Sequence, residues 1–90
     1  MKRLVTKNES LMSLFDALMK HSPMEVEFDF FNEIAEGNFI GYARFDRENA
    51  HAMKEALAKA GAETGFEITY SAGRGCVKNI LLWQLYAKQL

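Results

Sequence analysis

The side chains best suited to chemistry gather in residues 71–79, SAGRGCVKN, directly after a predicted strand. Backbone N–H groups of a glycine-rich turn can hold an anion, and Arg74 and Lys78 would supply positive charge there. However, the stretch lacks the Lys-Ser/Thr pair of a phosphate-binding loop, and Lys78 stands where a dinucleotide-binding motif needs its third glycine. We therefore interpret the stretch as a turn and keep anion contact by Arg74 and Lys78 as the alternative.

Other reactive residue types do not form a catalytic pattern. Cys76 is the only cysteine, and catalysis by its thiol would need a neighbouring base and an oxyanion donor. The two histidines, His21 and His51, stand in no recognisable catalytic signature. The acidic residues of 24–30, MEVEFDF, alternate with apolar ones, so they indicate the solvated face of a strand rather than a metal or acid–base cluster. The sequence predicts no enzyme, no cofactor and no metal site.

Composition restricts the class of protein. Ninety residues, of which 49% are hydrophobic and 26% charged, describe one globular domain, 1–90, with a single modest core. Eleven basic and twelve acidic side chains give a net charge of -1, so nucleic acid could bind only at a local basic patch. The lone cysteine, the polar N-terminus and the lack of eighteen consecutive apolar residues predict a cytoplasmic protein with no membrane segment.

Two amphipathic helices are predicted. The first follows a capping-box pair, Thr6 and Glu9, and carries apolar residues at i, i+3, i+4, i+7 and i+8 from Leu11 to Met19. The second is expected to begin after Asp46, which would cap it, and to end at Gly61. Each helix should therefore bury one apolar stripe against a sheet.

Strands are predicted at residues 2–6, 24–30, 39–45 and 65–72 from their alternation of apolar and polar side chains. Residues 31–38 would connect the second and third strands through a loop longer than two residues. With the helices, this gives the order β-α-β-β-α-β, the α+β two-layer sandwich of ferredoxin-like folds, with both helices on one face of an antiparallel sheet.

The C-terminal extension, residues 76–90, follows a predicted core of residues 2–72 and has two open interpretations. Its Leu, Gln, Ala and Lys content favours a helix, whereas its alternation also suits a fifth strand paired with the fourth. Leu82, Trp83 and Tyr86 belong to a run too apolar for one stripe of an exposed helix. The excess must be covered by the open sheet face, by a second copy or by another protein.

The stretch NFIGYARF, residues 38–45, resembles the third-strand motif of the RNA recognition motif family. The resemblance covers about residues 3–72 and includes LMSLFDALMKHSPMEVEF as that family's first helix and second strand. It implies the same fold and places Tyr42 at a position whose ring stacks on bases. The family's Lys or Arg, its Gly and its other stacking residue are replaced by Asn38, Phe39 and Ile40, so it implies the fold more than RNA binding.

The outward residues of this strand would be Ile40, Tyr42 and Arg44, beside the acidic face of residues 24–30. We expect Arg44 to pair with one of those carboxylates. The prediction is a small non-enzymatic protein-binding module, a regulator or inhibitor that contacts a protein partner or a second copy. The alternative is a degenerate single-stranded nucleic-acid binder that uses Tyr42 and Arg44 with Arg3, Arg74 and Lys78. The predicted partner-binding residues are Ile40, Tyr42, Arg44, Leu82, Trp83 and Tyr86.

Overall fold

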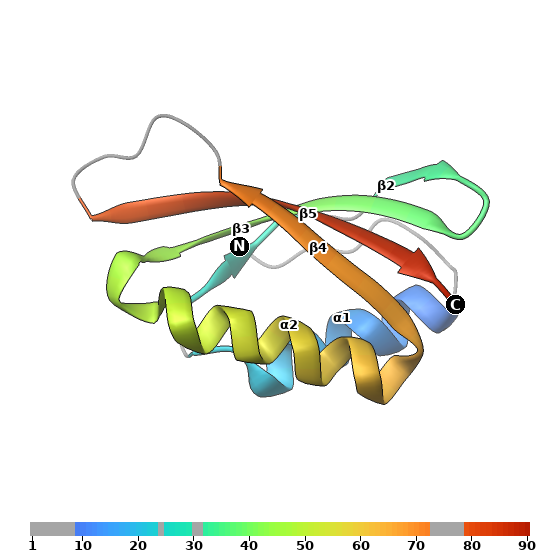
Figure 1. Cartoon of the computed structure of the whole chain (residues 1–90), viewed down its shortest axis with the longest axis horizontal. Helices are drawn as coiled ribbons and strands as arrows, with labels where there is room; N and C mark the ends of the chain where they lie inside the picture. The colour runs from blue at the N-terminus through green and yellow to red at the C-terminus, as the bar shows by residue number, and fades with distance from the viewer. Residues whose placement is uncertain (1–8, 24, 30–31, 73–78) are drawn as a thin grey trace.

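The computed structural model describes residues 9–23, 25–29, 32–72 and 79–90, and it has two layers, with two helices packed on one face of a sheet (Figure 1). The elements follow in the order α1 (Glu9–His21), β1 (Glu27–Phe28), β2 (Asn32–Ala35), β3 (Asn38–Asp46), a 3-10 turn (Arg47–Asn49), α2 (Ala50–Thr64), β4 (Phe66–Ala72) and β5 (Ile80–Gln89).

The sheet is antiparallel, with strand order β1-β3-β5-β4 and with β2 also paired to β3. Within the C-terminal extension, Ile80–Gln89 form a strand, so the strand interpretation is confirmed for these residues and the helix interpretation is wrong. β5 lies between β3 and β4, where a split βαβ fold has its first strand. The predicted first strand, residues 2–6, lies outside the described residues, so the α+β class is confirmed and the ferredoxin-like order is not.

Alternation in β3 and β5 builds the inner face of the sheet, which packs against the helices. Phe39 lies opposite Ala87, and Ala43 lies opposite Trp83, so large side chains face small ones across the strand pair. This arrangement fills the layer without crowding. Aromatic rings then meet edge to face, with Phe45 and Trp83 centroids 4.8 Å apart. The buried strand residues of this core, with Val26 just before β1, are Val26, Phe28, Phe39, Ala43, Phe45, Phe66, Trp83, Leu85 and Ala87.

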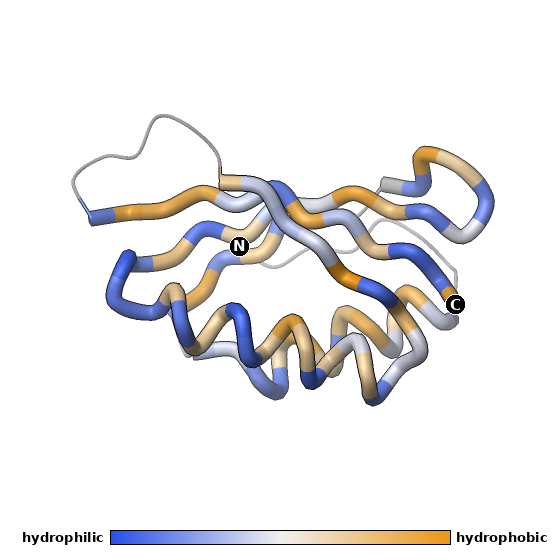
Figure 2. The backbone as a smooth tube through the Cα atoms, in the orientation of Figure 1, coloured by the Kyte–Doolittle hydropathy of each residue, from blue (hydrophilic) through white to orange (hydrophobic). Residues whose placement is uncertain are grey.

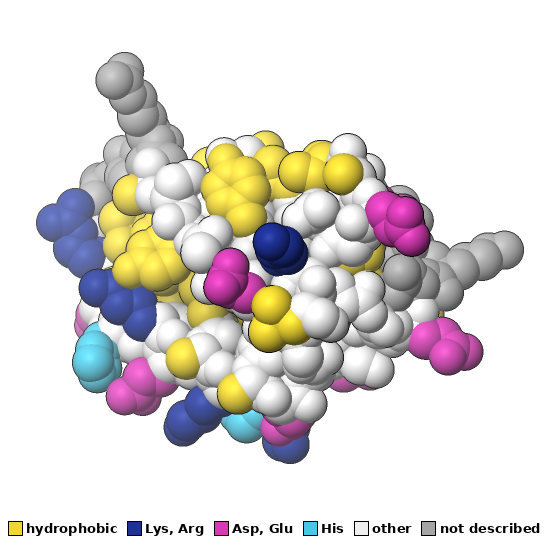
Figure 3. Space-filling model, turned by 45° about the vertical axis from the view of Figure 1, so that its right-hand side comes forward, with side chains coloured by type: hydrophobic (Ala, Val, Ile, Leu, Met, Phe, Trp, Pro, Cys, Tyr) yellow, Lys and Arg dark blue, Asp and Glu magenta, His cyan; other side chains and the backbone are white. Residues whose placement is uncertain are grey.

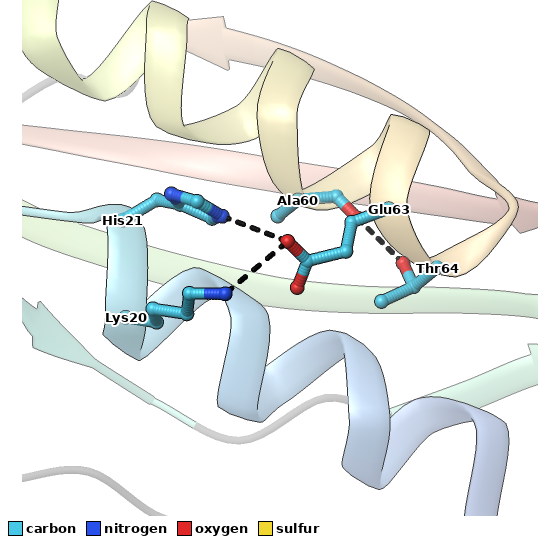
Figure 4. Close-up of polar contacts among 5 residues, drawn as sticks. All are labelled: Lys20, His21, Ala60, Glu63 and Thr64. Atoms are coloured by element: carbon cyan, nitrogen blue, oxygen red, sulfur yellow. Dashed lines mark hydrogen bonds and ion pairs between the residues drawn. The ribbon is translucent and has the colours of Figure 1, made fainter.

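Helix α1 contributes the stripe that the sequence predicts, with one exception. Leu11, Leu14 and Leu18 are fully buried, whereas Met19 is 40% exposed and Ala17 takes the buried position instead. At the end of α1, Lys20 Nζ and His21 Nε2 lie 3.4 Å and 3.2 Å from Glu63 Oε1 of α2 (Figure 4). The two helices are thus joined at the surface as well as through the core.

Both ends of α2 differ from the prediction. Asp46 precedes the 3-10 turn and makes no side-chain capping bond, and the helix continues past Gly61 to Thr64. Gly65 ends it because its φ of 77° is left-handed, a conformation that glycine adopts without strain. Gly61 instead allows a close approach, since a Cβ there would lie 2.6 Å from the Phe66 carbonyl oxygen.

The hairpin between β2 and β3 is tighter than predicted. Ala35 and Asn38 are paired, so only Glu36 and Gly37 form the turn, and Gly37 has a φ of 76°. The predicted strand 24–30 is reduced to β1, with Val26 and Phe28 buried and the neighbouring carboxylates exposed as expected. Figure 2 shows the hydrophobic start of β5, where Ile80 begins a run of three aliphatic residues.

Candidate functional site

The outer face of the sheet, which faces away from the helices, gathers side chains from β3 and β5. Ile40 lies opposite Tyr86, and Tyr42 lies opposite Gln84. Opposite residues in an antiparallel pair point to the same face, so these four form one surface with Leu82. We call Ile40, Tyr42, Leu82, Gln84 and Tyr86 the outer patch.

The outer patch presents apolar surface to solvent. Tyr42 and Leu82 are each 36% exposed and Tyr86 is 38% exposed, whereas Ile40 is half-buried. In Figure 3 hydrophobic side chains gather in the upper half of the view, over the sheet, and most charged side chains in view lie lower, around the helices. Exposed aromatic and aliphatic side chains on adjacent strands are typical of a binding surface rather than of scattered surface apolar residues.

Trp83 does not belong to this surface. It was predicted to contact a partner, but its position in β5 turns it to the inner face, where it is 4% exposed. The Tyr70 ring is stacked on it, with centroids 4.1 Å apart and planes 12° from parallel. Trp83 is therefore a core residue, covered on one side by Tyr70 and in T-shaped contact with Phe45.

Gln84 links the two tyrosines of the outer patch, a role that the sequence prediction missed. The Tyr86 hydroxyl donates to Gln84 Oε1 at 2.8 Å, and Gln84 Nε2 donates to the Tyr42 hydroxyl at 3.2 Å. The hydrogen-bonded chain Tyr86–Gln84–Tyr42 thus connects the two tyrosine hydroxyls across the outer patch. Alternation within 80–86 places Gln84 between Leu82 and Tyr86 on one face, but only if the segment is a strand.

Paired charges border the outer patch. Arg44 Nη2 donates to Glu27 Oε2 at 2.8 Å, as expected from the sequence, and this hydrogen bond lowers the pKa of the Glu27 carboxyl below its ordinary value. The backbone N–H of Asp29 donates to the Tyr42 carbonyl at 2.9 Å, so a second carboxylate lies next to the patch. On the other side, Glu67 of β4 lies opposite Lys88 of β5.

The remaining candidate residues lie elsewhere in the chain or outside the described part of it. Arg3, Arg74, Lys78 and Cys76 lie outside the described residues, so anion contact by Arg3, Arg74 and Lys78 stays a prediction. His21 contacts Glu63, as described above. The described ranges contain no cluster of three or more His, Cys, Asp or Glu side chains able to hold a metal ion.

The other described histidine is also on the helix layer. His51 Nε2 lies 3.3 Å from Glu55 Oε1, one turn along α2, and its side chain is 85% exposed.

None of the helices in the described part of the chain is long and apolar enough to cross a membrane.

Comparison of the chain with models of known protein families, with characterised proteins and with solved structures found no match. The resemblance to the RNA recognition motif family therefore remains a prediction. The geometry of the outer patch, together with its charges, is the basis for a functional assignment.

Proposed function

We propose that this protein is a non-enzymatic protein-binding module, a small regulator or inhibitor, whose contact surface is the outer patch. The observation that supports this most strongly is the row of exposed apolar side chains that β3 and β5 place side by side. Tyr42, Leu82 and Tyr86 stand on β3 and β5, the two central strands of the sheet, each of which is paired with a strand on both sides.

The composition of the outer patch fits the anatomy of a protein interface. Protein interfaces have an apolar centre with a polar rim, and Tyr and Arg are enriched among the residues that contribute most to affinity. Here Leu82 and the tyrosines form the centre, and Arg44 with Glu27 lies at the rim. Tyrosine gives a large contact area at little cost in conformational entropy, and the Gln84 hydrogen bonds reduce that cost further.

Local charge favours a protein partner over a nucleic acid. Arg44, which borders the patch, is paired with Glu27, and Asp29 lies beside Tyr42. A phosphate backbone would have to compete with these carboxylates for Arg44, and its binding depends on free positive charge. A protein with its own mixed-charge rim meets no such penalty.

The proposal is tested by a pull-down of interacting proteins followed by a titration of the isolated partner. We expect Tyr42→Ala and Tyr86→Ala each to weaken binding of that partner at least tenfold, while Met12→Ala on α1 leaves it unchanged. Met12 is a suitable control because it is 44% exposed on the helix layer. Melting curves for all three variants establish that they are folded. A partner that binds every variant equally would refute the outer patch as the contact surface.

One observation favours a second candidate, single-stranded RNA binding. The outer patch exposes two rings, Tyr42 and Tyr86, whereas the resemblance to the RNA recognition motif family places only Tyr42 at a stacking position. Stacking on an aromatic ring contributes about 1–3 kcal/mol per base. Fluorescence anisotropy with a mixed-sequence single-stranded RNA at low salt tests this candidate, and binding that is lost in Tyr42→Ala would establish it in place of protein binding.

A further inference from the structure

The free edge of β4 is a second candidate surface, next to the outer patch, because Thr69 and Ser71 of β4 lie opposite Tyr86 and Gln84. β4 runs from Phe66 to Ala72 at the end of the sheet order, and in the described part of the chain it pairs with β5 alone. Its outer edge therefore offers a row of backbone donors and acceptors to another strand.

The hydrogen-bond pattern identifies which residues face that edge. The Leu90 N–H donates to the Gly65 carbonyl at 3.0 Å, so Gly65 directs its backbone groups toward β5. Successive residues of a strand direct these groups to opposite sides, so Thr69 also faces β5. Ile68 and Tyr70 consequently direct their N–H and C=O groups to the free edge.

The opposite edge of the sheet is poorly suited to pairing with another strand, whereas the β4 edge is long and regular. There, β1 and β2 are two and four residues long, and their pairing with β3 has a register irregularity between Glu33 and Ala35. β4 is seven residues long and pairs with β5 without a shift. Its sequence, FEITYSA, contains no proline, no lysine and no arginine, the residues that protect exposed edges.

We infer that the β4 edge pairs antiparallel with β4 of a second copy of this chain, with Thr69 opposite the partner's Thr69. Thr69 is the middle residue of β4, so this register alone pairs the strand over its full length. It sets Thr against Thr and Ile68 against the partner's Tyr70. Both are favourable cross-strand pairs.

Charge and hydrogen bonding agree with the same register. Glu67, the single charged residue of β4, lies opposite the partner's Ser71, so no like charges meet. Ile68 lies opposite the partner's Tyr70, and both direct their backbone groups to the edge, so the two residues can exchange both hydrogen bonds. A second copy is thus complementary to β4 in residue order, charge and backbone pattern.

The pairing would also cover apolar surface on the helix side of the sheet. Tyr70 is 39% exposed and Ile68 is half-buried at this edge. In the dimer, Tyr70 of one copy would pack against Ile68 of the second copy, and the reverse. The two sheets would become one, with both outer patches on one continuous surface. The inference does not depend on the outer patch binding a partner.

The test is self-association measured by analytical ultracentrifugation over a wide concentration range, with charge variants at the symmetry axis. Thr69→Lys and Thr69→Glu should each weaken self-association of that variant by about three- to thirtyfold, because a Thr–Thr pair is replaced by like charges. An equimolar mixture of the two variants should associate again, since Lys and Glu then face each other. Ser71→Lys is the matched control, and it should keep or strengthen association because it faces the partner's Glu67.

Amide hydrogen exchange gives a second readout that does not depend on substitutions. The Ile68 and Tyr70 amides should become protected as concentration rises, and the Glu33 amide on the opposite edge should not. A chain that stays monomeric, Ile68 and Tyr70 amides protected at every concentration, or a dimer indifferent to the Thr69 variants would each overturn the inference.

Discussion

The two faces of β5 are made by neighbouring residues with opposite surroundings. Trp83 and Leu85 are 4% and 0% exposed among the core side chains, whereas Leu82 and Tyr86 are 36% and 38% exposed on the other side. Because strand side chains alternate, one ten-residue strand supplies both the centre of the core and the centre of the outer patch. Core residues and residues of the proposed contact surface therefore alternate along β5.

The comparison also shows how differently the two faces are held. The inner face is fixed by packing against α1 and α2 and by aromatic contacts such as Phe45 with Trp83. The outer face is fixed by hydrogen bonds through Gln84 and by the Arg44–Glu27 ion pair. Substitutions on the inner face should consequently change the free energy of unfolding, and those on the outer face should change binding.

The strongest test of this separation compares two adjacent residues, Trp83 and Leu82. Trp83→Ala should lower the free energy of unfolding by about 3–5 kcal/mol, because it leaves a cavity between Phe45 and Tyr70. Leu82→Ala should lower it by less than about 1 kcal/mol, because the side chain is already partly in water. Urea denaturation of both variants measures the difference, and equal losses would show that the outer patch is part of the core.

Local periodicity explains what the sequence could predict. The apolar stripe of α1 and the outward set Ile40, Tyr42 and Arg44 depend only on spacing within one element. The face of Trp83 and the role of Gln84 depend on whether residues 80–89 form a strand, and their helix-favouring composition conflicts with their alternation. Pairing with β3 and β4 on both sides decides the matter, and no local signal contains that information.

The end of α2 illustrates the same limit on a smaller scale. Gly61 and Gly65 are both residues that commonly end a helix, and the sequence predicts Gly61 as the end. Only the left-handed φ of Gly65 and the distance from Gly61 to the Phe66 carbonyl separate the two roles. A close approach between a helix and the following strand is a tertiary feature, so the sequence alone could not predict it.

Gly61→Ala is the next test, because two effects predict opposite signs. Helix propensity alone would stabilise α2 by about 1 kcal/mol. The new Cβ would lie 2.6 Å from the Phe66 carbonyl oxygen, so α2 or β4 must move, at a cost of about 1–3 kcal/mol. We expect net destabilisation in thermal unfolding, with exposed Ala62→Ser as a control of small effect. A more stable Gly61→Ala variant would show that the helix layer adjusts freely over the inner face.

Tyr70 lies on the inner face of the sheet, at the β4 edge, and is a test of how much a partly exposed ring contributes to stability. Its ring is stacked on Trp83 yet is 39% exposed, so Tyr70→Ala should destabilise the fold by about 1–2 kcal/mol through lost ring contact and apolar burial. Tyr70→Phe keeps the ring and should be nearly neutral. Tyr86→Ala, with an equally exposed ring on the outer face, should change the unfolding midpoint less than Tyr70→Ala does. A larger change for Tyr86→Ala than for Tyr70→Ala would mean that the exposed ring on the outer face stabilises the fold more than the ring stacked on Trp83.

The smallest expected effect lies on the helix layer, where Lys20 and His21 contact Glu63. The hydrogen bond with His21, followed by the charge of Lys20, lowers the pKa of the Glu63 carboxyl below its ordinary value of 4.5. The folded state therefore holds fewer protons at this site than the unfolded state. The resulting stabilisation is present above pH 4.5 and is lost as pH falls through the lowered pKa.

Glu63→Gln removes the charge at every pH and isolates this contribution. Its unfolding midpoint in urea should lie slightly below that of the parent protein at about pH 6, and the two should converge as pH falls to about 3. Glu67→Gln on β4 is the control, and its difference from the parent should not follow the same profile. If the midpoint of Glu63→Gln differs from that of the parent protein by the same amount at every pH in this range, the charge of Glu63 does not stabilise the contact between the two helices.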